Sequence, residues 1–327
     1  MTIFFTSGSH KISPINFTPA TKELFTFAVE RQKVFFRRRK GTIPWTDNSI
    51  LKEFKFTNTY RALDRVSQYL IRNVIYKSGF TNSQTFYRIL LFKIFNKIET
   101  WKALESELGS IIVSENSLKH IESLLDEKCQ VGTIFSGAYI MPSGSRQFGF
   151  AKKHKSYLYV LQMMIQDELH AKVFDAPSLE HVYQELLKYP LIGPFLGFQF
   201  SIDLNYSDFL DFDEMDFVVA GPGAIDGISK CFKSLNMSPE NLIRIIAEEQ
   251  EVLFHHFNLN FETLGGRKLQ LIDWQNLFCE TSKYTRVSMP EVTGVSGRTR
   301  IKQKFRENVT PIDYFFPPKW KIILPPV

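Results

Sequence analysis

The chain has 327 residues, of which 44% are hydrophobic and 14% aromatic, so it can bury a large core and lacks the low hydrophobicity of disordered proteins. Its 40 basic and 34 acidic residues give a formal net charge of +6, which favours polyanionic partners. Its cysteines, Cys129, Cys231 and Cys279, are widely spaced without a CxxC pair, which excludes a disulfide framework and a cysteine-bound zinc site.

Most of the chain carries the apolar spacing of amphipathic helices. The predicted helices cover 21–39, 57–76, 83–95, 100–108, 114–129 and 157–174. Strand signals are short, flanked by Gly and Pro, and have no second alternating run with which to pair. The sequence therefore predicts a mostly α fold.

Two clusters of basic residues are candidates for contact with a phosphate backbone. The first, Arg37, Arg38, Arg39 and Lys40, ends the first predicted helix. The second follows a Gly- and Ser-rich segment, 132–155, which we expect to cross between two helical halves; its cations are Lys152, Lys153 and Lys155. The alternative interpretation is that both clusters are solvated faces.

The stretch YPLIGPFLGFQFSIDL, which begins at Tyr189, predicts a tight turn between two helices. Gly193 permits the turn, and Pro194 suits the first position of the following helix. The free amides of such a helix start can hold a phosphate without reading bases. We therefore expect Ile192 and Gly193 to contact a DNA backbone.

An acidic stretch follows this turn and resembles a known catalytic position. Helix-hairpin-helix DNA glycosylases place an essential aspartate at a similar distance behind their hairpin, and Asp213 and Asp216 lie 20 and 23 residues after Gly193. We prefer Asp216 as the catalytic carboxylate, which would stabilise an oxocarbenium-like sugar, with Asp213 and Glu214 as alternatives. These acids could instead cap helices or face solvent.

The sequence departs from that glycosylase pattern at two places. Leu191 replaces the first glycine of the usual hairpin, and Pro194 and Phe195 stand where lyase members carry a lysine. The resemblance therefore implies hydrolysis without a Schiff base.

A second resemblance covers nearly the whole chain. Five ordered blocks resemble the helical family of α-glutamyl/putrescinyl thymine pyrophosphorylases and of 5-hydroxymethyluracil DNA kinases. They are FTNTYRALDR (56–65), GAYIM (137–141), IGPFLGFQFSIDL (192–204), VAGPGAIDGI (219–228) and DWQNLFCETSKYTR (273–286). The resemblance implies a glycosylase-like fold and a link to hypermodified pyrimidines of phage DNA, which some members are thought to excise in anti-phage defence.

The same resemblance implies a set of pocket residues. We expect the following to converge around a flipped base: Asn58, Arg61, Asp64, Gln199, Asp203, Glu280, Lys283 and Tyr284, with Tyr139 as a further aromatic candidate. Helical spacing lets the polar ends of Asn58, Arg61 and Asp64 share a face. The alternative is a buried Arg–Asp pair that joins two helices.

Together these patterns predict a helix-hairpin-helix DNA glycosylase-like fold with two helical halves around a cleft. A domain at 1–290 would contain lobes at about 20–131 and 156–290, and a basic, extended tail would follow at 291–327. The predicted protein is a cytoplasmic, prokaryotic monomer that binds double-stranded phage DNA with modified pyrimidines. No membrane segment, metal or cofactor is predicted, because no run reaches about 18 apolar residues and the histidines lack ligand spacing.

The predicted function is a monofunctional DNA glycosylase that removes a hypermodified pyrimidine, for example a glycosylated hydroxymethyl pyrimidine, and leaves an abasic site. Two alternatives remain open. One is a transferase or pyrophosphorylase-like enzyme of thymine hypermodification, and the other is a non-catalytic reader of modified DNA. The motif GxxxxGK[ST] is absent, which argues against a kinase.

Overall fold

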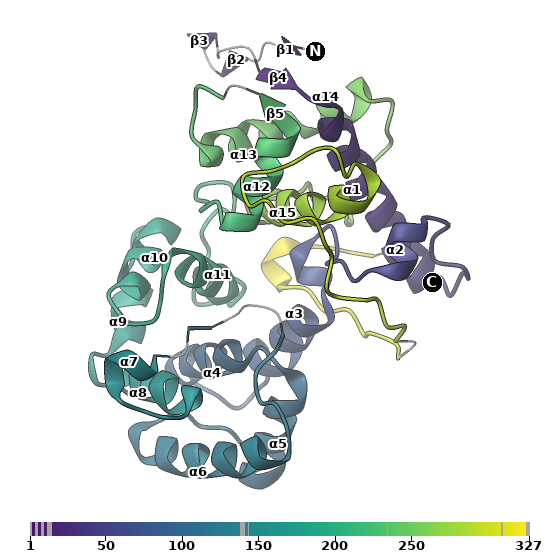
Figure 1. The fold of residues 1–327 in the computed structure, drawn as a ribbon. Coiled ribbons are helices and arrows are strands. Elements are labelled where there is room, and N and C mark those ends of the chain that lie inside the picture. Colours follow the sequence, from purple (N-terminus) through teal and green to yellow (C-terminus); the bar gives the residue numbers. More distant parts are fainter. Residues whose placement is uncertain are drawn as a thin grey trace. The chain divides into compact units, whose positions relative to one another are not determined.

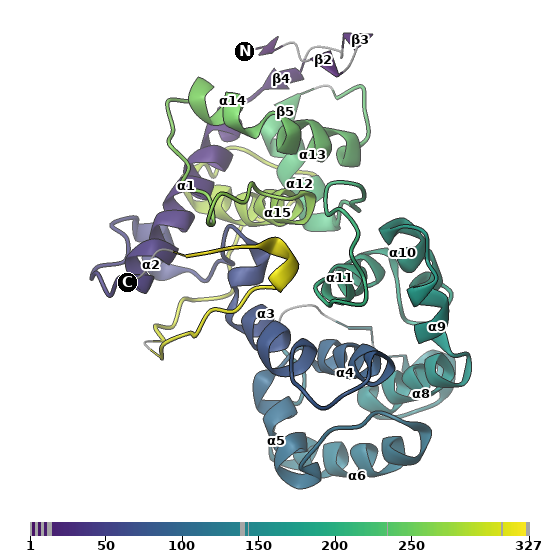
Figure 2. The same cartoon turned by 180° about the vertical axis from the view of Figure 1, so that it is seen from behind.

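The structure, a computed structural model, describes residues 2–3, 6–7, 10–11, 15–137, 141–142, 144–233, 235–308 and 310–324. The predicted pocket residue Tyr139 lies outside them. Nearly all regular structure in the described residues is helical (Figures 1 and 2), which confirms the predicted mostly α class.

The described chain divides into two compact units. Unit 1 comprises Met1–Asp64, Phe217–Ile312 and Trp320–Val327, and unit 2 comprises Arg65–Asp216 and Asp313–Lys319. This division differs from the predicted lobes, because the segment 132–155 lies wholly inside unit 2 and the chain changes unit near residues 64 and 216. The physical reason is long-range packing: the apolar face of the first helix packs against helices that begin about 200 residues later.

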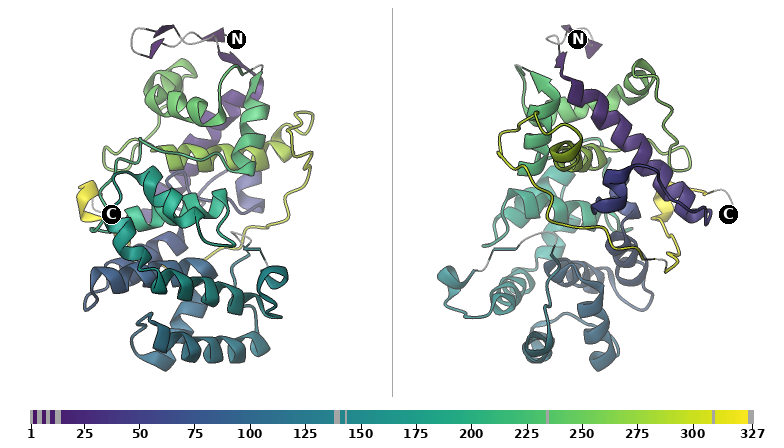
Figure 3. Two further views of the ribbon diagram at one scale, coloured as in Figure 1. Left: turned by 90° about the vertical axis from the view of Figure 1, so that its left-hand side faces the viewer. Right: turned by 45° about the vertical axis from the view of Figure 1, so that its right-hand side comes forward.

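Unit 1 holds the short strands and seven helical segments of the described chain. The antiparallel strands β1 (Thr2–Ile3), β4 (Ile15–Phe17) and β5 (Phe232–Lys233) form one sheet in the order β1-β4-β5, and β2 (Thr6–Ser7) pairs with β3 (His10–Lys11). The helices are α1 (Pro19–Arg39), α2 (Ser49–Glu53), η1 (Arg61–Leu63), α12 (Pro222–Cys231), α13 (Pro239–Glu248), α14 (Gln250–His256) and α15 (Leu271–Ser288). Figure 3 shows α1, α12 and α15 packed side by side.

Two glycines allow α12 to approach α15 closely. A Cβ atom on Gly227 would lie 2.0 Å from the carbonyl oxygen of Phe278, and one on Gly223 would lie 2.3 Å from the Cys279 sulfur. No other residue fits at Gly227 without moving a backbone. One turn earlier on α15, Trp274 packs against Phe25 of α1 with 5.3 Å between ring centroids.

Unit 2 is helical throughout its described part. Its helices are α3 (Arg65–Tyr69), the π-helix η2 (Leu70–Ile75), α4 (Asn82–Phe95), α5 (Ile98–Leu108), α6 (Glu115–Val131), α7 (Ser145–Phe148), α8 (Lys153–Gln166), α9 (Leu169–Phe174), α10 (Leu179–Leu187) and α11 (Pro194–Asn205). The turn η3 (Pro318–Trp320) follows near the C terminus.

Two predicted helices are interrupted, each at a residue with non-helical backbone. The helix predicted at 57–76 breaks at Asp64, whose extended backbone (ψ 141°) separates η1 from α3. The helix predicted at 157–174 breaks at Glu168, which adopts the left-handed conformation (φ 51°) between α8 and α9. Both interruptions occur within continuous apolar spacing, so periodicity alone does not reveal them.

The core of unit 2 contains a buried ion pair. The Lys93 ammonium of α4 lies 2.7 Å from the Asp203 carboxylate of α11, and their side chains are 4% and 0% exposed. Asp203, predicted as a pocket residue, therefore joins two helices of unit 2. Its neighbour one turn earlier, Gln199, is also buried on α11.

We expect Lys93→Met to destabilise the protein by about 3–5 kcal/mol, because it leaves the Asp203 charge buried without its cation. Urea unfolding followed by circular dichroism measures the change. The double variant Lys93→Met/Asp203→Leu should recover most of the loss. A single variant as stable as the wild type would show that the pair does not hold α4 and α11 together.

Candidate functional site

The loop that precedes η1 in unit 1 uses consecutive backbone amides to bind two carboxylates. The Thr57 N–H donates to Glu280 Oε2 at 3.1 Å, and the Asn58 N–H donates to Asp64 Oδ1 at 2.8 Å. The Asn58 side chain donates to the same Asp64 oxygen at 3.0 Å. The loop therefore fixes one carboxylate from its own segment beside one from α15.

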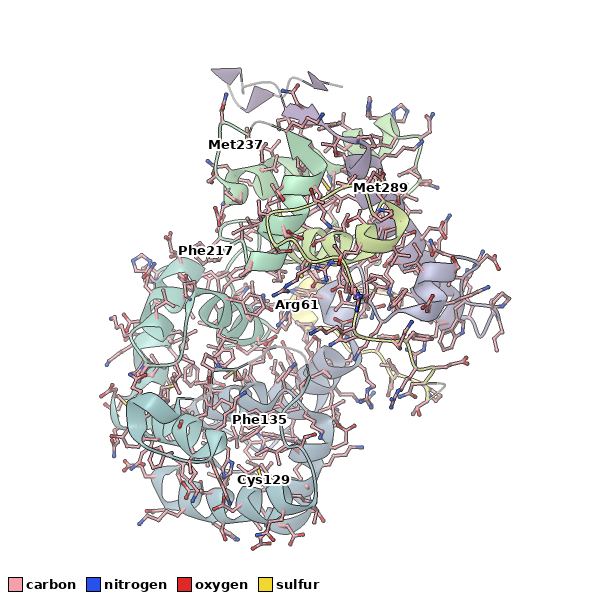
Figure 4. All side chains as sticks on the ribbon, in the orientation of Figure 1. Arg61, Cys129, Phe135, Phe217, Met237 and Met289 are labelled. Atoms are coloured by element: carbon pink, nitrogen blue, oxygen red, sulfur yellow. The ribbon has the colours of Figure 1, made fainter. Side chains whose placement is uncertain are left out.

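A third carboxylate attaches this loop to the start of α15. The Arg61 N–H donates to Asp273 Oδ1 at 2.8 Å, while Asp273 Oδ2 accepts from the Gln270 N–H at 3.0 Å and caps the helix. Arg61 is 2% exposed, and Figure 4 labels it beside the helices of unit 1. The Arg61 backbone thus attaches η1 to the first turn of α15 through Asp273.

One face of α15 supplies the other side of the site. Its polar residues recur every three or four positions: Asp273, Asn276, Glu280, Lys283 and Tyr284. Lys283 Nζ lies 2.7 Å from Glu280 Oε2, and the Asn276 amide donates to the Thr57 hydroxyl at 2.8 Å. The Tyr284 hydroxyl accepts from the Asn48 amide at 2.7 Å. We call the 57–64 loop and this helix face the carboxylate site.

Asp64 is a residue of the carboxylate site whose protonation is altered by burial. Burial raises the pKa of Asp64 to about 6, and the negative charge of Glu280 adds to that rise. The Asn58 hydrogen bonds and the positive charge of Arg31 oppose it but do not cancel it. A carboxyl group with a pKa near neutrality can both take up and release a proton, which is the property of a general base.

The structure thus brings together six of the predicted pocket residues in unit 1: Asn58, Arg61, Asp64, Glu280, Lys283 and Tyr284. It places Gln199 and Asp203 in unit 2. Thr57, Asp273 and Asn276 were missed by the sequence interpretation. Helical spacing from Glu280 back to Asn276 and Asp273 is the signal that would have found the two on α15.

The acidic stretch behind α11 lies at the end of unit 2 and surrounds a lysine from the C-terminal region. Lys319 Nζ donates to the carbonyls of Asn205 and Ser207 at 2.6 and 3.0 Å, and it lies 3.6 Å from Asp211 Oδ1. Burial lowers the pKa of Lys319, while Asp211, Glu214 and Asp208 raise it. These acids therefore stabilise a cation that fastens residues 313–319 to unit 2.

The residues preferred for catalysis form a turn within that stretch. Asp213 Oδ1 accepts from the Met215 N–H at 2.8 Å, and the Asp216 N–H donates to the Asp213 carbonyl at 3.2 Å. Glu214 is buried, with 6% of its surface exposed. The next helix, α12, begins at Pro222, six residues after Asp216.

The predicted turn before α11 is present, but its strained residue is not glycine. Leu191 adopts a left-handed conformation (φ 67°), Gly193 caps the helix and Pro194 occupies its first position. Packing holds Leu191 in this conformation, because its Cδ1 fills the space next to Gly144. A Cβ atom built on Gly144 would lie only 2.6 Å from Leu191 Cδ1. The Ile192 side chain is buried, and Gly193 is exposed.

The second basic cluster is neutralised by acids of α6. Lys152 Nζ lies 2.6 Å from Asp126, and Lys155 Nζ lies 2.8 Å from Glu122 and 3.0 Å from Asp126. The neighbouring Lys153 ammonium lies 4.5 Å from the ring centroid of Phe135. Asp126 and Glu122 therefore pair with Lys152 and Lys155 and fasten the start of α8 to α6, while contact of this cluster with DNA stays a prediction.

A cysteine and a histidine at the same place have the spacing of a nucleophile and its base. Cys129 Sγ lies 3.7 Å from His154 Nδ1, and His154 Nε2 lies 3.1 Å from Asp126. Burial raises the pKa of the Cys129 thiol and lowers the pKa of the His154 imidazole. Both groups are therefore stabilised in their neutral forms, which is the reverse of an activated thiolate.

The first basic cluster lies at the end of α1 in unit 1. Arg37 is 3.8 Å from the exposed Asp47 carboxylate, and the Arg38 guanidinium lies 5.2 Å from the Trp45 ring centroid. Arg39 is half-buried and Lys40 is exposed. Contact of these cations with DNA stays a prediction.

The described residues show neither a metal-binding cluster nor a membrane-spanning helix. They contain no group of three or more His, Cys, Asp or Glu side chains placed to hold a metal ion. None of the helices in the described part of the chain is both long enough and apolar enough to cross a membrane.

Residues 18–294, which include the whole carboxylate site, match the family model described as 5-hmdU DNA kinase, helical domain. The chain belongs to this family. The 5-hmdU DNA kinase of Bacillus phage SP10 is a relative, 25% identical over 283 residues, and the match covers 80% of this chain and 44% of the phage protein. The chain thus spans less than half the length of that relative. No solved structure matches the chain.

Family membership corrects the predicted activity. The prediction of a monofunctional DNA glycosylase is wrong, because the family and the phage relative are both described as 5-hmdU DNA kinases, and a kinase is a transferase rather than a hydrolase. The role predicted for Asp216, stabilisation of a sugar cation during base hydrolysis, falls with that activity. The family resemblance itself is confirmed.

Proposed function

We propose that the chain works on DNA containing 5-hydroxymethyluracil, as a transferase that changes the 5-hydroxymethyl group and leaves the sugar–base bond intact. The family description and the name of the phage relative support this substrate. The observation that carries the proposal is Asp64, a carboxyl with a pKa of about 6 that Asn58 holds inside the family-matched region.

If a phosphoryl group comes from a nucleoside triphosphate, the hydroxymethyl oxygen bonds to phosphorus and loses its proton, and the nucleoside diphosphate leaves. If an amine displaces the pyrophosphate of a pyrophosphorylated hydroxymethyl group, the amine nitrogen bonds to the methylene carbon and loses a proton, and pyrophosphate leaves. In its ionised form, Asp64 takes that proton, and the two Asn58 hydrogen bonds fix the orientation of its carboxylate. Lys283, which is 18% exposed and paired with Glu280, supplies positive charge for an anionic group of the substrate. The target base has to leave the duplex stack for these side chains to reach it.

The direct test uses duplex DNA with 5-hydroxymethyluracil at one position and a thymine duplex as control. The protein is incubated with a nucleoside triphosphate or, using DNA whose hydroxymethyl group is pyrophosphorylated, with amines and amino acids. Enzymatic digestion and mass spectrometry then identify the nucleosides. We expect a heavier nucleoside with an intact glycosidic bond from the modified duplex alone. Unchanged nucleosides under every condition, or a released free base, would contradict the transferase.

A non-catalytic reader of the modified base is a second candidate function. One observation favours it: the sequence contains no GxxxxGK[ST] motif for a triphosphate. Tighter binding of the hydroxymethyluracil duplex than of the thymine duplex, with no change in nucleoside mass, would support the reader over the transferase.

A further inference from the structure

The segment RTRIKQKFR in unit 1, residues 298–306, carries a cation at every second position. We call it the basic strap, and its cations are Arg298, Arg300, Lys302, Lys304 and Arg306. The strap contains no helix, and all five cations are exposed. In an extended chain, side chains two positions apart point to the same side, so the alternation gathers the positive charge on one side of the strap.

The basic strap is fastened to the rest of unit 1 at both ends and in the middle. Its centre pairs with the C-terminal end of α2 and the residues just after it, since the Lys55 N–H donates to the Gln303 carbonyl at 3.1 Å and the Phe305 N–H donates to the Glu53 carbonyl at 2.9 Å. Arg286 of α15 donates to the Arg300 carbonyl at 3.1 Å. In Figure 1 the strap is the olive segment that follows α15.

Beyond the strap, Arg38 of α1 donates to the Asn308 carbonyl at 2.8 Å. The region predicted as an extended tail is therefore held in place along its basic part. A binding segment that is already ordered loses less conformational entropy when a ligand binds.

Four of the five strap cations have charge available for a ligand. Lys304 forms an ion pair with Glu53, but across the described ranges no carboxylate lies within ion-pair distance of Arg298, Arg300, Lys302 or Arg306. This contrasts with Lys152 and Lys155, whose charges are neutralised by α6.

The dimensions of the strap fit a nucleic-acid strand. The nine residues from Arg298 to Arg306, in an extended chain, span about 26 Å, because they are separated by eight steps of roughly 3.3 Å each. One strand of B-DNA carries a phosphate about every 3.4 Å along its axis, so the same length presents about eight phosphates. A row of cations of this length, four of the five without an acidic partner in the described chain, can follow a phosphate backbone.

We propose that the basic strap is a binding strand for the DNA phosphate backbone, which holds the substrate without reading its bases. This inference rests on the proposed function only in taking DNA as the ligand. It assigns the electrostatic contact to residues 298–306 rather than to the Lys152–Lys155 cluster.

The test compares two triple variants of the full chain that remove equal charge. The strap variant is Arg298→Gln/Arg300→Gln/Lys302→Gln, and the control is Lys152→Gln/Lys155→Gln/Lys188→Gln, which removes lysines already paired with acids. Fluorescence anisotropy gives the Kd for an unmodified duplex over a series of salt concentrations. Circular dichroism checks that both variants are folded.

For the strap variant, we expect binding at least about tenfold weaker at low salt and a slope of log Kd against log salt reduced by roughly 2–3, because about three phosphate contacts are lost. The loss should be equal for thymine and hydroxymethyluracil duplexes. The control should keep the slope of the wild type.

The proposal is overturned if the strap variant keeps the slope of the wild type, or if the control lowers it equally. The two proposals fail separately. A strap effect on unmodified DNA in a protein that transfers nothing would reject the proposed function alone, whereas turnover with a normal slope in the strap variant would reject the strap alone.

Discussion

Asp64→Asn should lower the transfer rate on hydroxymethyluracil DNA by at least about 100-fold, the usual contribution of a positioned general base, and should make the protein more stable at pH 8. Asparagine keeps an oxygen that accepts the two Asn58 hydrogen bonds, so the loop geometry is preserved. It cannot take up a proton from the nucleophile.

The stability gain follows from the direction of the Asp64 pKa shift. The folded protein raises this pKa to about 6, above the value of about 3.9 for an unfolded chain, so folding favours the protonated form. That contribution is fully present below pH 4 and is lost as the pH rises through 6. At pH 8 the ionised carboxylate costs up to about 3 kcal/mol, which the neutral asparagine avoids.

Urea unfolding between pH 4 and pH 8 measures this linkage, and rates over the same range should rise through pH 6 in the wild type. Asp47→Asn serves as the matched control, because Asp47 is an exposed acid of unit 1 with 80% of its side chain accessible. An unchanged transfer rate in Asp64→Asn would show that a residue other than Asp64 is the general base. A variant less stable than the wild type at pH 8 would make Asp64 a structural residue.

Gly227→Ala is expected to destabilise unit 1 by more than about 3 kcal/mol, at or beyond the upper end of the usual cost of overpacking a core. The new methyl group would lie 2.0 Å from the Phe278 carbonyl oxygen, so the α12 and α15 backbones must separate. This separation would also shift Glu280 and Lys283 on α15, and we expect the transfer activity to fall with stability.

Gly223→Ala offers a control on the same helix, because there the clash is with a side chain. Its Cβ would lie 2.3 Å from the Cys279 sulfur but 3.2 Å from the Cys279 Cβ. Adding Cys279→Ala should therefore restore much of the stability lost in Gly223→Ala, while the same addition should not rescue Gly227→Ala. Thermal unfolding of the four variants tests this pattern, and rescue of Gly227→Ala would show that the backbone contact is not limiting.

The features that the sequence predicted well are those that short stretches determine. The helices predicted at 83–95 and 100–108 lie within two residues of α4 and α5, since apolar spacing and a capping residue such as Thr81 are local signals. The same is true of the turn at Gly193. On α15, Glu280, Lys283 and Tyr284 were expected from the family resemblance, whereas Asp273 and Asn276 were not predicted.

The features that were not predicted depend on partners far away in the chain. The spacing between Gly193 and Asp216 matched a catalytic position, yet the neighbouring acids surround Lys319, which lies about 100 residues later. The attachment of Arg61 to Asp273 and the division into units also need long-range packing. Residue types and local spacing do not specify such contacts, and the spacing from Gly193 to Asp216 therefore supported a glycosylase prediction that the family description contradicts.

The division of the chain between the units also sets the order in which the two units can fold during synthesis. The ribosome completes residues 65–216 in one continuous stretch, so unit 2 can acquire nearly all of its chain first. The apolar face of α1, with Leu24 and Phe25, must wait for α12 and α15, about 200 residues downstream. At typical elongation rates this delay is on the order of 10–50 s. During that interval the apolar face of α1 has no partner in unit 1, and we expect it to be available to chaperones on the nascent chain.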